Sequence, residues 1–599
     1  MLILGISFGH SSAAVLLVNG KIKDAVEEEK LSRIKGHATF PQMAIDYILK
    51  KNNLLPEDID RIAIGCKDIA EWSYFYRNLN KYFKKTGIFH KGVGLYYDGV
   101  KQCFPFIDNR SVLTRAFYKY VSALGFHKEK IELIDHHLAH AASAYYSSQW
   151  RECAIFTSDG KGDGLSGTFS IGINGTMRCC DKIKDLNSIG QLYSTVTKFL
   201  GFKWNRHEGK ITGLAAFGDD GKTFNLMNSV FTFEKGRLRN SFQEIPEFKK
   251  NPLKYYRKLK KNIISNNYVR FLNGTLRNFA ISYQLYHNFF EDNLSSFEAK
   301  DIASGVQKLL EESLLEYLKN KLEEHKFTKI CLAGGVFANV KLNQKIMELP
   351  GIKNIYVQPA MDDAGTALGA ALHINMKLNN NKSWTGLETV YTGPVYSASE
   401  IKNALEKNNL SYRKLECHEE ELGKWLYEGK IIGRFNGALE WGPRALGNRS
   451  ILAHPIENEI NDTLNKRLKR TEFMPFAPSV LDEDADSFFK EYSSDHIASR
   501  YMTTTYNVNP SKIGLIPAVV HVDGTSRPQV VFEEDNPSYY KIIKAYKKHS
   551  GIGCIINTSF NMHEEPIVNS PEDAIRAFLA GAVDILSMGE FVVEASDIA

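Results

Sequence analysis

Two stretches of this chain follow one plan: LILGISFGHSSAAVLLVNGKI (Leu2–Ile22) and AIFTSDGKGDGLSGTFSIGINGTM (Ala154–Met177). Each has an apolar strand, a loop of small polar residues, a second apolar strand and an Asn-Gly pair, which is a strong hairpin signal. In the second stretch we assign the loop to Asp159–Gly164. The repeated plan predicts a duplicated α/β domain with a cleft between its halves; the alternative is two unrelated hairpins.

A third unit, KICLAGGVFANVKLNQKI (Lys329–Ile346), reads as a buried strand, a Gly334-Gly335 turn and a helical stretch. Glycines at a strand end, or where a strand meets a helix, let backbone N–H groups approach phosphate. We therefore expect phosphate or nucleotide contacts at Gly334, Gly335 and, in the second loop, Gly160 and Lys161. Tight backbone packing is the competing interpretation of the glycine pair.

The composition is that of an ordinary globular protein. The 599 residues are 43% hydrophobic and 24% charged, with a net charge of +6, and the length predicts more than one domain. So small a charge argues against nucleic acid or an anionic membrane as the main partner. The basic run KKNPLKYYRKLKK (Lys249–Lys261) could grip nucleic acid, but a solvated helix face is the simpler interpretation.

The eight cysteines include no C-x-x-C pair, so neither a disulfide framework nor a thiolate zinc site is indicated, and we expect a cytoplasmic location. The apolar start Met1–Val18 lacks the basic residues of a signal peptide and is interrupted by polar residues, so we interpret it as strand, turn and strand. No stretch reaches the length of about 18 uncharged apolar residues that a spanning helix needs.

The polar segment LNNNKS (Leu378–Ser383) reads as a linker. We predict a first domain over residues 1–385, with a mainly helical insertion over 220–328, and a second domain over 386–599.

Three histidines lie within five residues of IDHHLAHAASAYYSS (Ile134–Ser148). If the segment is helical from Leu138 onward, His136 and His140 share one face, and two imidazoles at that spacing can bind one divalent metal. Carboxylates follow two other apolar strands, at Asp159 and at Asp362/Asp363. Two histidines with two carboxylates suit iron, manganese or zinc.

His10 lies at the tip of the first polar loop. A loop histidine with a pKa near neutrality suits general base work, although a histidine without a role is the alternative at this position.

Arginines lie among glycines and small hydroxyl residues in the second half of the chain, and arginine's planar fork suits bidentate anion binding. The segments that carry this pattern include Arg444, Arg449, Lys466, Arg467, Lys469, Arg470, Arg527, Ser559 and Asn561. No G-x-x-x-x-G-K-[ST] run is present, so the pattern is not that of a P-loop. As a set, these residues predict an oxyanion or nucleotide site.

Ten runs, in order along the chain, resemble the O-carbamoyltransferase family of antibiotic and nodulation-factor biosynthesis, which includes the tobramycin and cephamycin carbamoyltransferases. The runs are GHSSAAVLLVNG, DHHLAHAASAYYSS, SDGKGDG, HEGKITGLAAFG, LAGGVFANVKLN, DDAGTALGAAL, EWGPRALGNRSILA, PFAPSV, HVDGTSRPQVV and NTSFNMHEEPIV. They span residues 9 to about 570.

The resemblance implies an actin/Hsp70-like duplicated N-terminal domain followed by a YrdC-like α/β C-terminal domain. It implies that the C-terminal domain makes carbamoyl-adenylate from carbamoyl phosphate and ATP with Mg²⁺. The N-terminal domain would then pass the carbamoyl group to a hydroxyl of a small-molecule acceptor, with Fe²⁺ or a similar divalent metal as cofactor.

Carried over position by position, the resemblance puts the catalytic histidine at His10. The implied metal ligands are His136, His140, Asp159 and Asp363, and the implied adenylation residues are Arg444, Arg527, Ser559 and Asn561. Many members have an arginine where this chain has Met474, so Lys469 and Arg470 are the candidates for meeting carbamoyl phosphate.

Two other function classes fit parts of the sequence. An actin-fold small-molecule kinase explains the duplicated hairpins but leaves the histidine cluster and the C-terminal half without a task. A nucleotide-regulated RNA-binding or scaffold protein would use the basic run. The sequence leaves open the identity of the acceptor and whether the chain forms a homo-oligomer.

Overall fold

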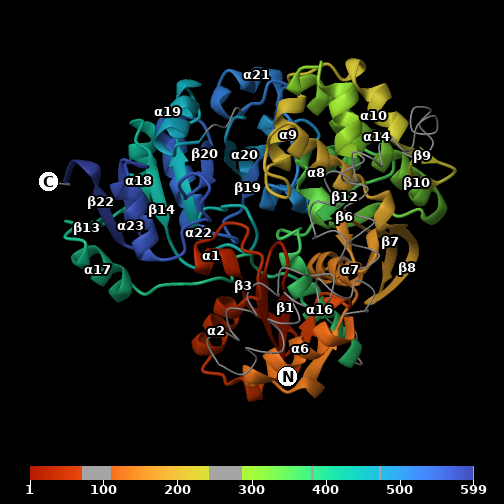
Figure 1. Cartoon of the computed structure of the whole chain (residues 1–599). Coiled ribbons are helices and arrows are strands. Elements are labelled where there is room, and N and C mark those ends of the chain that lie inside the picture. Colours follow the sequence, from red (N-terminus) through yellow and green to blue (C-terminus); the bar gives the residue numbers. More distant parts are fainter. Residues whose placement is uncertain (70–109, 242–285, 380–383, 471–473, 598–599) are drawn as a thin grey trace.

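The computed structural model describes residues 1–69, 110–241, 286–379, 384–470 and 474–597. In Figure 1 these residues form three lobes: one at the bottom around β1, one at the right around β6, and the C-terminal lobe at the left and top. Each lobe is built around one of the larger sheets in the described part of the chain, two of five strands and one of eight.

The two five-stranded sheets have the same topology. Their strand orders are β3-β2-β1-β4-β5 and β8-β7-β6-β11-β12. In both, the first three strands along the chain form an antiparallel meander and the last two join in parallel. The first sheet contains β1 (Leu2–Ser7), β2 (Ala13–Val18), β3 (Lys21–Glu27), β4 (Arg61–Ile64) and β5 (Ile131–Leu133). The second contains β6 (Glu152–Gly162), β7 (Leu165–Ile173), β8 (Thr176–Lys184), β11 (Lys329–Ala333) and β12 (Asn354–Val357).

Both Asn-Gly pairs form the predicted two-residue turns. Asn19 and Gly20 have φ of 51° and 82°, and Asn174 and Gly175 have φ of 48° and 79°, which is the left-handed pair that a hairpin turn of this kind requires. The prediction for the second polar loop was too long: β6 continues to Gly162, so only Asp163 and Gly164 form the turn.

Helices sandwich and separate the two five-stranded sheets. Between the sheets lie α7 (His136–Ser147), against β6 and β11, and α16 (Ala364–Leu378), against β1 and β2; the two helices also pack on each other. The outer core of the first sheet includes α2 (Gln42–Lys51) and α6 (Arg110–Ala123), and that of the second includes α8 (Ile189–Phe199) and α14 (Ala299–His325). The shorter elements of these lobes are α1 (Glu28–Ser32), α9 (Glu208–Ala215), α10 (Phe224–Val230), α15 (Val340–Met347), β9 (Phe231–Glu234) and β10 (Arg237–Asn240).

The C-terminal lobe has one mixed sheet in the order β13-β22-β21-β14-β15-β20-β16-β19. Its strands are β13 (Arg413–Lys414), β14 (Ile432–Phe435), β15 (Arg449–Ala453), β16 (Ala477–Leu481), β19 (Gln529–Val531), β20 (Cys554–Ser559), β21 (Ile585–Met588) and β22 (Phe591–Glu594). Its helices are α17 (Ala398–Lys407), α18 (His418–Tyr427), α19 (Glu459–Arg467), α20 (Asp482–Phe488), α21 (Pro510–Ile513), α22 (Pro537–Ser550) and α23 (Pro571–Leu579). The strands β17 (Tyr506–Asn507) and β18 (Thr525–Ser526) form a separate two-stranded sheet.

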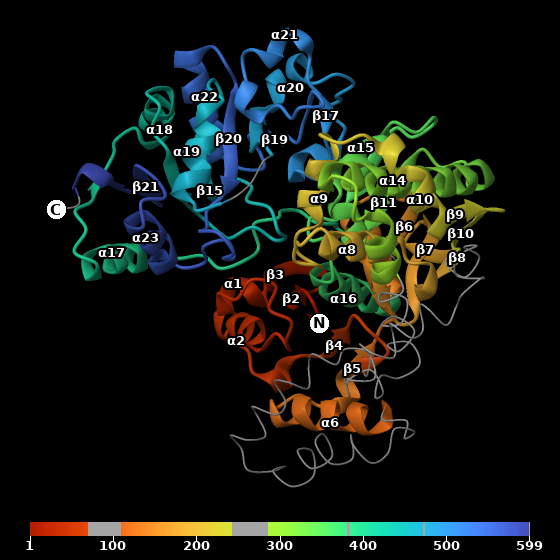
Figure 2. The same ribbon diagram turned by 45° about the horizontal axis from the view of Figure 1, so that its top comes forward.

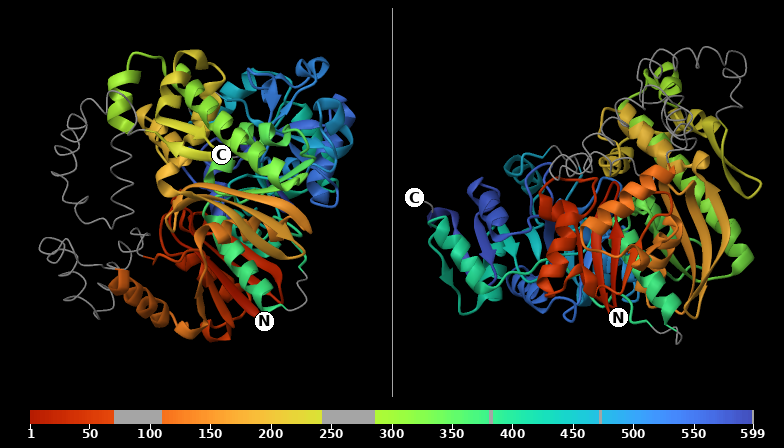
Figure 3. Two further views of the ribbon diagram at one scale, coloured as in Figure 1. Left: turned by 90° about the vertical axis from the view of Figure 1, so that its right-hand side faces the viewer. Right: turned by 60° about the horizontal axis from the view of Figure 1, so that its bottom comes forward.

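A buried charge pair fastens the C-terminal lobe to the first sheet. Lys30 is 1% exposed; its Nζ donates to the carbonyl oxygens of Glu440 and Gly442 at 2.6 and 2.8 Å and lies 2.8 Å from Glu27. Asn343 of α15 donates to the carbonyl of Thr503 at 2.7 Å, so the second sheet's lobe also contacts the C-terminal lobe. Figures 2 and 3 show this three-lobed arrangement from other sides.

The predicted α/β class and the duplicated, actin-like N-terminal fold are confirmed by the repeated topology, and a second α/β unit follows it. The insertion was expected to be mainly helical; its described residues contain α10 and α14, and also the hairpin of β9 and β10 over Phe231–Asn240. The basic run Lys249–Lys261 lies outside the described residues. Helix α16 ends at Leu378, and a boundary near residue 385 stays a prediction. None of the described helices is long and apolar enough to cross a bilayer.

Candidate metal centre and arginine site

The four predicted metal ligands converge between α7, α16 and the end of β6. The Nε2 atoms of His136 and His140 lie 3.1 Å apart, and each lies 3.4 Å from Asp159 Oδ2. Asp363 Oδ1 lies 3.6 and 3.7 Å from the same two nitrogens. Ligand atoms at about 2.1 Å from a tetrahedral metal are about 3.4 Å apart, so the donor atoms have the spacing of a four-ligand site. The two nitrogens and two oxygens suit a divalent transition metal.

Local structure aims both imidazoles at this point. Helix α7 begins at His136, two residues before the predicted start, because the Asp135 side chain caps it by accepting from Leu138 N at 3.1 Å. The i, i+4 spacing then places His136 and His140 one turn apart on one face. Gly162 makes room for the first ring, since a Cβ there would lie 2.1 Å from His136 Cδ2.

The carboxylates come from two other elements. Gly160 N donates to Asp159 Oδ1 at 2.6 Å, which leaves Oδ2 directed at the histidines. Asp363 is the residue before α16. That helix lies close to α7 because Gly369 has no side chain: a Cβ there would lie 1.8 Å from the carbonyl oxygen of Ala139.

The charges of this group favour a cation. Burial lowers the pKa of His136, but the hydrogen bond to Asp159 and the charges of Asp363 and Asp159 outweigh it and raise that pKa to about 9. Burial raises the pKa of Asp159, yet its hydrogen bonds to His136 and His140 hold it well below the usual value. A bound metal would supply the positive charge between the imidazoles that these carboxylates stabilise.

The neighbours of these ligands have other partners. His137 is buried and pairs through Nδ1 with Thr157 Oγ1 at 2.9 Å; burial and the two adjacent histidines hold its pKa well below the usual value. Asp362 accepts from Ser11 Oγ at 2.7 Å, and burial raises its pKa to about 7. The geometry therefore directs Asp363, rather than Asp362, at the histidine pair.

His10 lies in the turn between β1 and β2 and is partly exposed. Two serines attach this turn to the loop that carries Asp362 and Asp363. Ser7 Oγ donates to the carbonyl oxygen of Asp363 at 2.7 Å, and Ser11 Oγ donates to Asp362 Oδ2 at 2.7 Å. The ring Nε2 of His10 lies 3.2 Å from Asn205 Nδ2. The turn that carries His10 is thus attached to the loop of Asp363, and His10 is not one of the four candidate ligands.

The predicted phosphate glycines have different surroundings. Gly160 and Lys161 lie within β6, and a Cβ on Gly160 would meet nothing within 4 Å. Gly334, at φ 108°, packs so closely that a Cβ would lie 2.2 Å from Ser158 O. Gly335 faces Asp159 Oδ1, which is 3.1 Å from its ideal Cβ position. Tight packing therefore accounts for Gly334, and a phosphate role at these four residues stays a prediction.

In the C-terminal lobe, Arg470 is tied to two of the predicted residues. Its Nη2 donates to Ser559 Oγ at 3.2 Å and to Asn561 Oδ1 at 2.6 Å, and its Nη1 donates to Thr558 Oγ1 at 3.1 Å. Ser559 Oγ also donates to Asn561 Oδ1 at 2.6 Å. Lys469, the other candidate for carbamoyl phosphate, is exposed and follows the end of α19.

Arg444 and Arg527 form a pair of like charges. Burial lowers the pKa of Arg444 to about 10. Burial, and then the charge of Arg444, hold the pKa of Arg527 well below its usual value. Across the described residues neither guanidinium has a carboxylate within 4 Å, and the Nε of Arg444 has no hydrogen-bond partner there. Two half-buried cations without a counter-charge among the described residues make a site for an anion.

Arg449, by contrast, has a structural role. Its guanidinium is buried, donates to the carbonyls of Asn436 at 2.7 Å and Gly437 at 3.1 Å, and lies 3.7 Å from the ring centre of Phe435. Glu440 completes the loop, because its Oε1 accepts from the backbone nitrogens of Leu446, Asn448 and Arg449 at 2.8 to 3.0 Å. This loop holds Arg444 in place.

The two sites adjoin. A Cβ on Gly442, at φ 103°, would lie 2.6 Å from Pro359 O, so the loop of Arg444 touches the loop of Asp363. Met474, which replaces the family arginine, packs against Gly213 of α9: a Cβ there would lie 1.9 Å from its Sδ. Met474 thus fills a contact between the C-terminal lobe and α9.

One feature of this junction was missed in the sequence. His207 Nε2 lies 3.0 Å from Glu564 Oε1, and Lys203 Nζ contacts Glu564 Oε2. His207 and Glu564 lie in the motifs HEGKITGLAAFG and NTSFNMHEEPIV, but the sequence predicts a role for neither residue. The signal was the pairing of a histidine with an acid, which becomes visible only when the two motifs meet in space.

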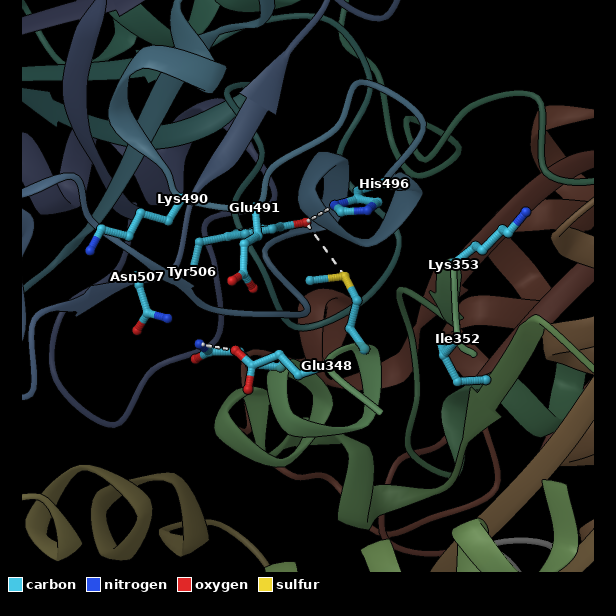
Figure 4. Close-up of a pocket in the computed structure, with 10 residues that line it drawn as sticks. Glu348, Ile352, Lys353, Lys490, Glu491, His496, Tyr506 and Asn507 are labelled. Atoms are coloured by element: carbon cyan, nitrogen blue, oxygen red, sulfur yellow. Dashed lines mark hydrogen bonds between the residues drawn. The ribbon is translucent and has the colours of Figure 1, made fainter. Parts of the chain in front are cut away.

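A separate pocket of about 180 Å³ lies between α15 and residues 490–507 (Figure 4). In it, the Tyr506 hydroxyl lies 3.2 Å from His496 Nδ1, and the two rings stack with an interplanar angle of 16°. Its charged lining residues are of both signs: Glu348, Lys353, Lys490 and Glu491. None of the predicted site residues lines it.

Comparison with known families identifies the protein family of this chain. Residues 2–372 match the model described as "Carbamoyltransferase N-terminus", and residues 423–595 match "Carbamoyltransferase C-terminus". The chain belongs to the carbamoyltransferase family. It is therefore a transferase, and all the predicted site residues lie within the two matched segments.

Relatives of this carbamoyltransferase come from distant organisms. An uncharacterized protein of Methanocaldococcus jannaschii is 32% identical, with 93% of this chain and 89% of the relative aligned. Nodulation protein NolNO of Sinorhizobium fredii is 30% identical over 98% of this chain and 79% of its own length. Among solved structures, full-length HypF aligns at 15% identity with a TM-score of 0.32, over 64% of this chain and 47% of HypF; at that score the likeness carries no argument.

Proposed function

We propose that this carbamoyltransferase is an ATP-dependent O-carbamoyltransferase with two half-reactions. The C-terminal unit, over residues 386–599 and YrdC-like, makes carbamoyl-adenylate from carbamoyl phosphate and ATP with Mg²⁺. The N-terminal unit, over residues 1–385, transfers the carbamoyl group to a hydroxyl of a small molecule. The observation that carries the proposal is the pairing of Arg444 and Arg527 without a counter-charge in a carbamoyltransferase.

In the first half-reaction, water cleaves carbamoyl phosphate to carbamate and phosphate. A carbamate oxygen then attacks the α-phosphorus of ATP, and pyrophosphate leaves with the electrons of the broken P–O bond. Arg444 and Arg527 would hold phosphoryl oxygens, because bidentate guanidinium contacts stabilise the charge that develops there. Arg470, held by Ser559 and Asn561, would face the same chemistry.

In the second half-reaction, the acceptor oxygen attacks the carbamoyl carbon, and AMP leaves as the C–O bond to phosphate breaks. His10 would accept the proton of the acceptor hydroxyl. A metal held by His136, His140, Asp159 and Asp363, iron being the metal implied by the family resemblance, would polarise the carbonyl. The neighbouring position of the two sites supports transfer without exposure of the intermediate to bulk water.

We propose natural products and sugars as the class of acceptor. The relative NolNO of Sinorhizobium fredii is named as a nodulation protein. We infer a reducing, cytoplasmic setting from the cysteine pattern. Lys469 or Arg470 would take the place of the family arginine at Met474.

The test uses the full-length chain with ATP, Mg²⁺ and carbamoyl phosphate, in the presence of a panel of hydroxyl compounds. We expect pyrophosphate release that requires carbamoyl phosphate, and a mass increase of one carbamoyl group on one panel member. Phosphorylation of a panel member, independent of carbamoyl phosphate, would instead establish a kinase. An absence of both activities with RNA binding would favour the scaffold alternative.

A pair of variants separates the half-reactions. His10→Asn should release pyrophosphate normally while transfer slows by about 10²–10⁴-fold, the usual effect of removing a general base. Arg527→Ala should lose pyrophosphate release but still transfer from synthetic carbamoyl-adenylate. If His10→Asn transfers at the wild-type rate, another group is the base.

A further inference from the structure

One acidic residue of the C-terminal lobe contacts the segment that faces His10. Glu564 lies in the NTSFNMHEEP motif, three residues after Asn561. Its carboxylate contacts Lys203 and lies 3.0 Å from His207 Nε2, both of which belong to the loop before α9. The Lys203 hydrogen bond is the main reason why the pKa of Glu564 is lowered to about 2, so the carboxylate is ionised throughout the working range.

The backbone of this contact is constrained. Glu564 has φ of 62°, a left-handed conformation that costs a residue with a side chain about 1 kcal/mol or more and persists where surrounding contacts impose it. Two neighbours supply those contacts: Glu565 O accepts from Asn561 Nδ2 at 2.6 Å, and Pro566 O accepts from Arg33 Nη2 at 2.9 Å.

On the other side, the loop before α9 leads to His10. Asn205 lies between Lys203 and His207, and its Nδ2 is 3.2 Å from His10 Nε2. Its backbone nitrogen donates to Glu208 Oε1 at 2.6 Å, which fixes the Asn205 backbone to the start of α9. Hydrogen bonds therefore run from Arg470 through Asn561 to the Glu564 loop, and from Glu564 to the segment that positions Asn205.

We propose that Glu564 is a positioning residue: it holds residues 203–208 so that Asn205 orients the His10 imidazole. The loop of the C-terminal lobe that carries Asn561 and Glu564 would thereby set the orientation of His10 in the N-terminal domain. The inference rests on the proposed function, because that function gives His10 its task as the base for the acceptor hydroxyl. A neutral imidazole donates through one ring nitrogen and accepts through the other. With the Asn205 amide turned to present Oδ1 to Nε2–H, Nδ1 is the nitrogen that takes the proton of the acceptor hydroxyl, so the Asn205 contact fixes both the ring plane and the tautomer.

The contact is not needed to keep the lobes together. The buried Lys30, which is paired with Glu27, donates to the backbone carbonyl of Glu440 and so joins the C-terminal lobe to the first sheet. Asn343 joins that lobe to the second sheet. A matched control exists at Lys341, which lies 2.9 Å from Asp523 and also bridges the lobes, at a similar side-chain exposure of 26% against 29% for Glu564. Removing either ion pair deletes one partly exposed interlobe contact, but only one of them touches the loop before α9.

The experiment compares full-length Glu564→Gln, Lys341→Gln and the charge swap Lys203→Glu with Glu564→Lys. Hydrogen exchange of residues 203–212 and the ¹³C-labelled imidazole signal of His10, assigned from its absence in His10→Asn, report the geometry. We expect exchange at least 10-fold faster and a shifted His10 signal in Glu564→Gln, wild-type behaviour in Lys341→Gln, and partial restoration in the swap.

Carbamoyl-phosphate-dependent pyrophosphate release by the same variants is the second readout, and we expect it to stay within about 2-fold of wild type. A role in folding alone would change exchange across the C-terminal lobe and lower pyrophosphate release in parallel, which overturns the inference. So would unchanged exchange and an unshifted His10 signal in Glu564→Gln. Failure of the proposed function is distinguishable, because it would appear as absent pyrophosphate release in the wild type, whereas exchange and the imidazole signal need no substrate.

Discussion

The metal group and the arginine pair have opposite imbalances of charge. Asp159 and Asp363 surround two imidazoles and stabilise positive charge between them. Arg444 and Arg527 lie close to each other, with no carboxylate within 4 Å in the described segments. Each imbalance indicates the class of ligand that relieves it: a cation at the buried histidine pair and an anion at the half-buried arginine pair.

The two sites also differ in how their residues are held. The metal group comes from a helix face, a strand end and a helix start. Arg444 and Arg527 come from loops, and the loop of Arg444 depends on Glu440 and Arg449. A preformed geometry can select a metal, whereas loops can adjust to a phosphate chain.

The largest expected effect is complete loss of metal in His140→Ala. The wild type purified without added metal should contain about one transition metal per chain, and the variant none, because three remaining ligands include only one imidazole. Elemental analysis gives the numbers. His137→Gln is the matched control: that histidine bonds Thr157, so metal should stay. A variant that retains the metal would remove His140 from the ligand set.

Next in size is the loss of adenylation in Arg527→Ala. We expect pyrophosphate release to fall by roughly 10²–10³-fold, the usual effect of removing one donor to developing charge. Arg527→Lys should recover only part of it, since an ammonium group cannot form the bidentate contact. Equal activity of the Lys variant and the wild type would show that charge, rather than geometry, is what this site provides.

The third prediction concerns stability and contrasts Arg444, in the loop before β15, with Arg449, the first residue of that strand. Arg449→Ala leaves the carbonyls of Asn436 and Gly437 without their donor, so the free energy of unfolding should fall by about 3 kcal/mol. Arg444→Ala removes a half-buried charge that has no carboxylate partner among the described residues and should leave the free energy of unfolding unchanged or higher. Chemical denaturation of both variants measures the difference; a loss in Arg444→Ala as large as that in Arg449→Ala would contradict the anion-site interpretation.

The smallest effect is stabilisation by pyrophosphate. At about 10 times its dissociation constant a ligand stabilises by about 1.4 kcal/mol, which corresponds to about 3–5 °C for a unit of this size. Thermal melts should show this rise in the wild type and not in Arg444→Ala, with sodium chloride at equal ionic strength as the control. A rise of equal size in chloride would mean that only general screening is at work.

The sequence predicted a large part of the fold and of the site chemistry. The Asn-Gly turns marked both hairpins, because few residue pairs tolerate two successive left-handed conformations. It placed the polar loop at Asp159–Gly164, whereas β6 runs to Gly162. Asp-Gly is a turn signal and occurs twice here, but only the second pair, Asp163-Gly164, forms the turn. The β9–β10 hairpin was missed because its strands have only four residues each.

Residue type and local spacing were determined by the sequence itself: two histidines one helical turn apart, an acid after each of two apolar strands, and arginines set among small residues. Only the tertiary structure decided which of them meet. It directed Asp363 rather than Asp362 at the histidines, committed Arg449 to its own loop while leaving Arg444 without a counter-charge, and joined Glu564 to Lys203. The reason is physical: a side chain's partners depend on the approach of elements distant in the chain, such as α16 on α7 at Gly369, and one chain's local pattern does not encode that approach.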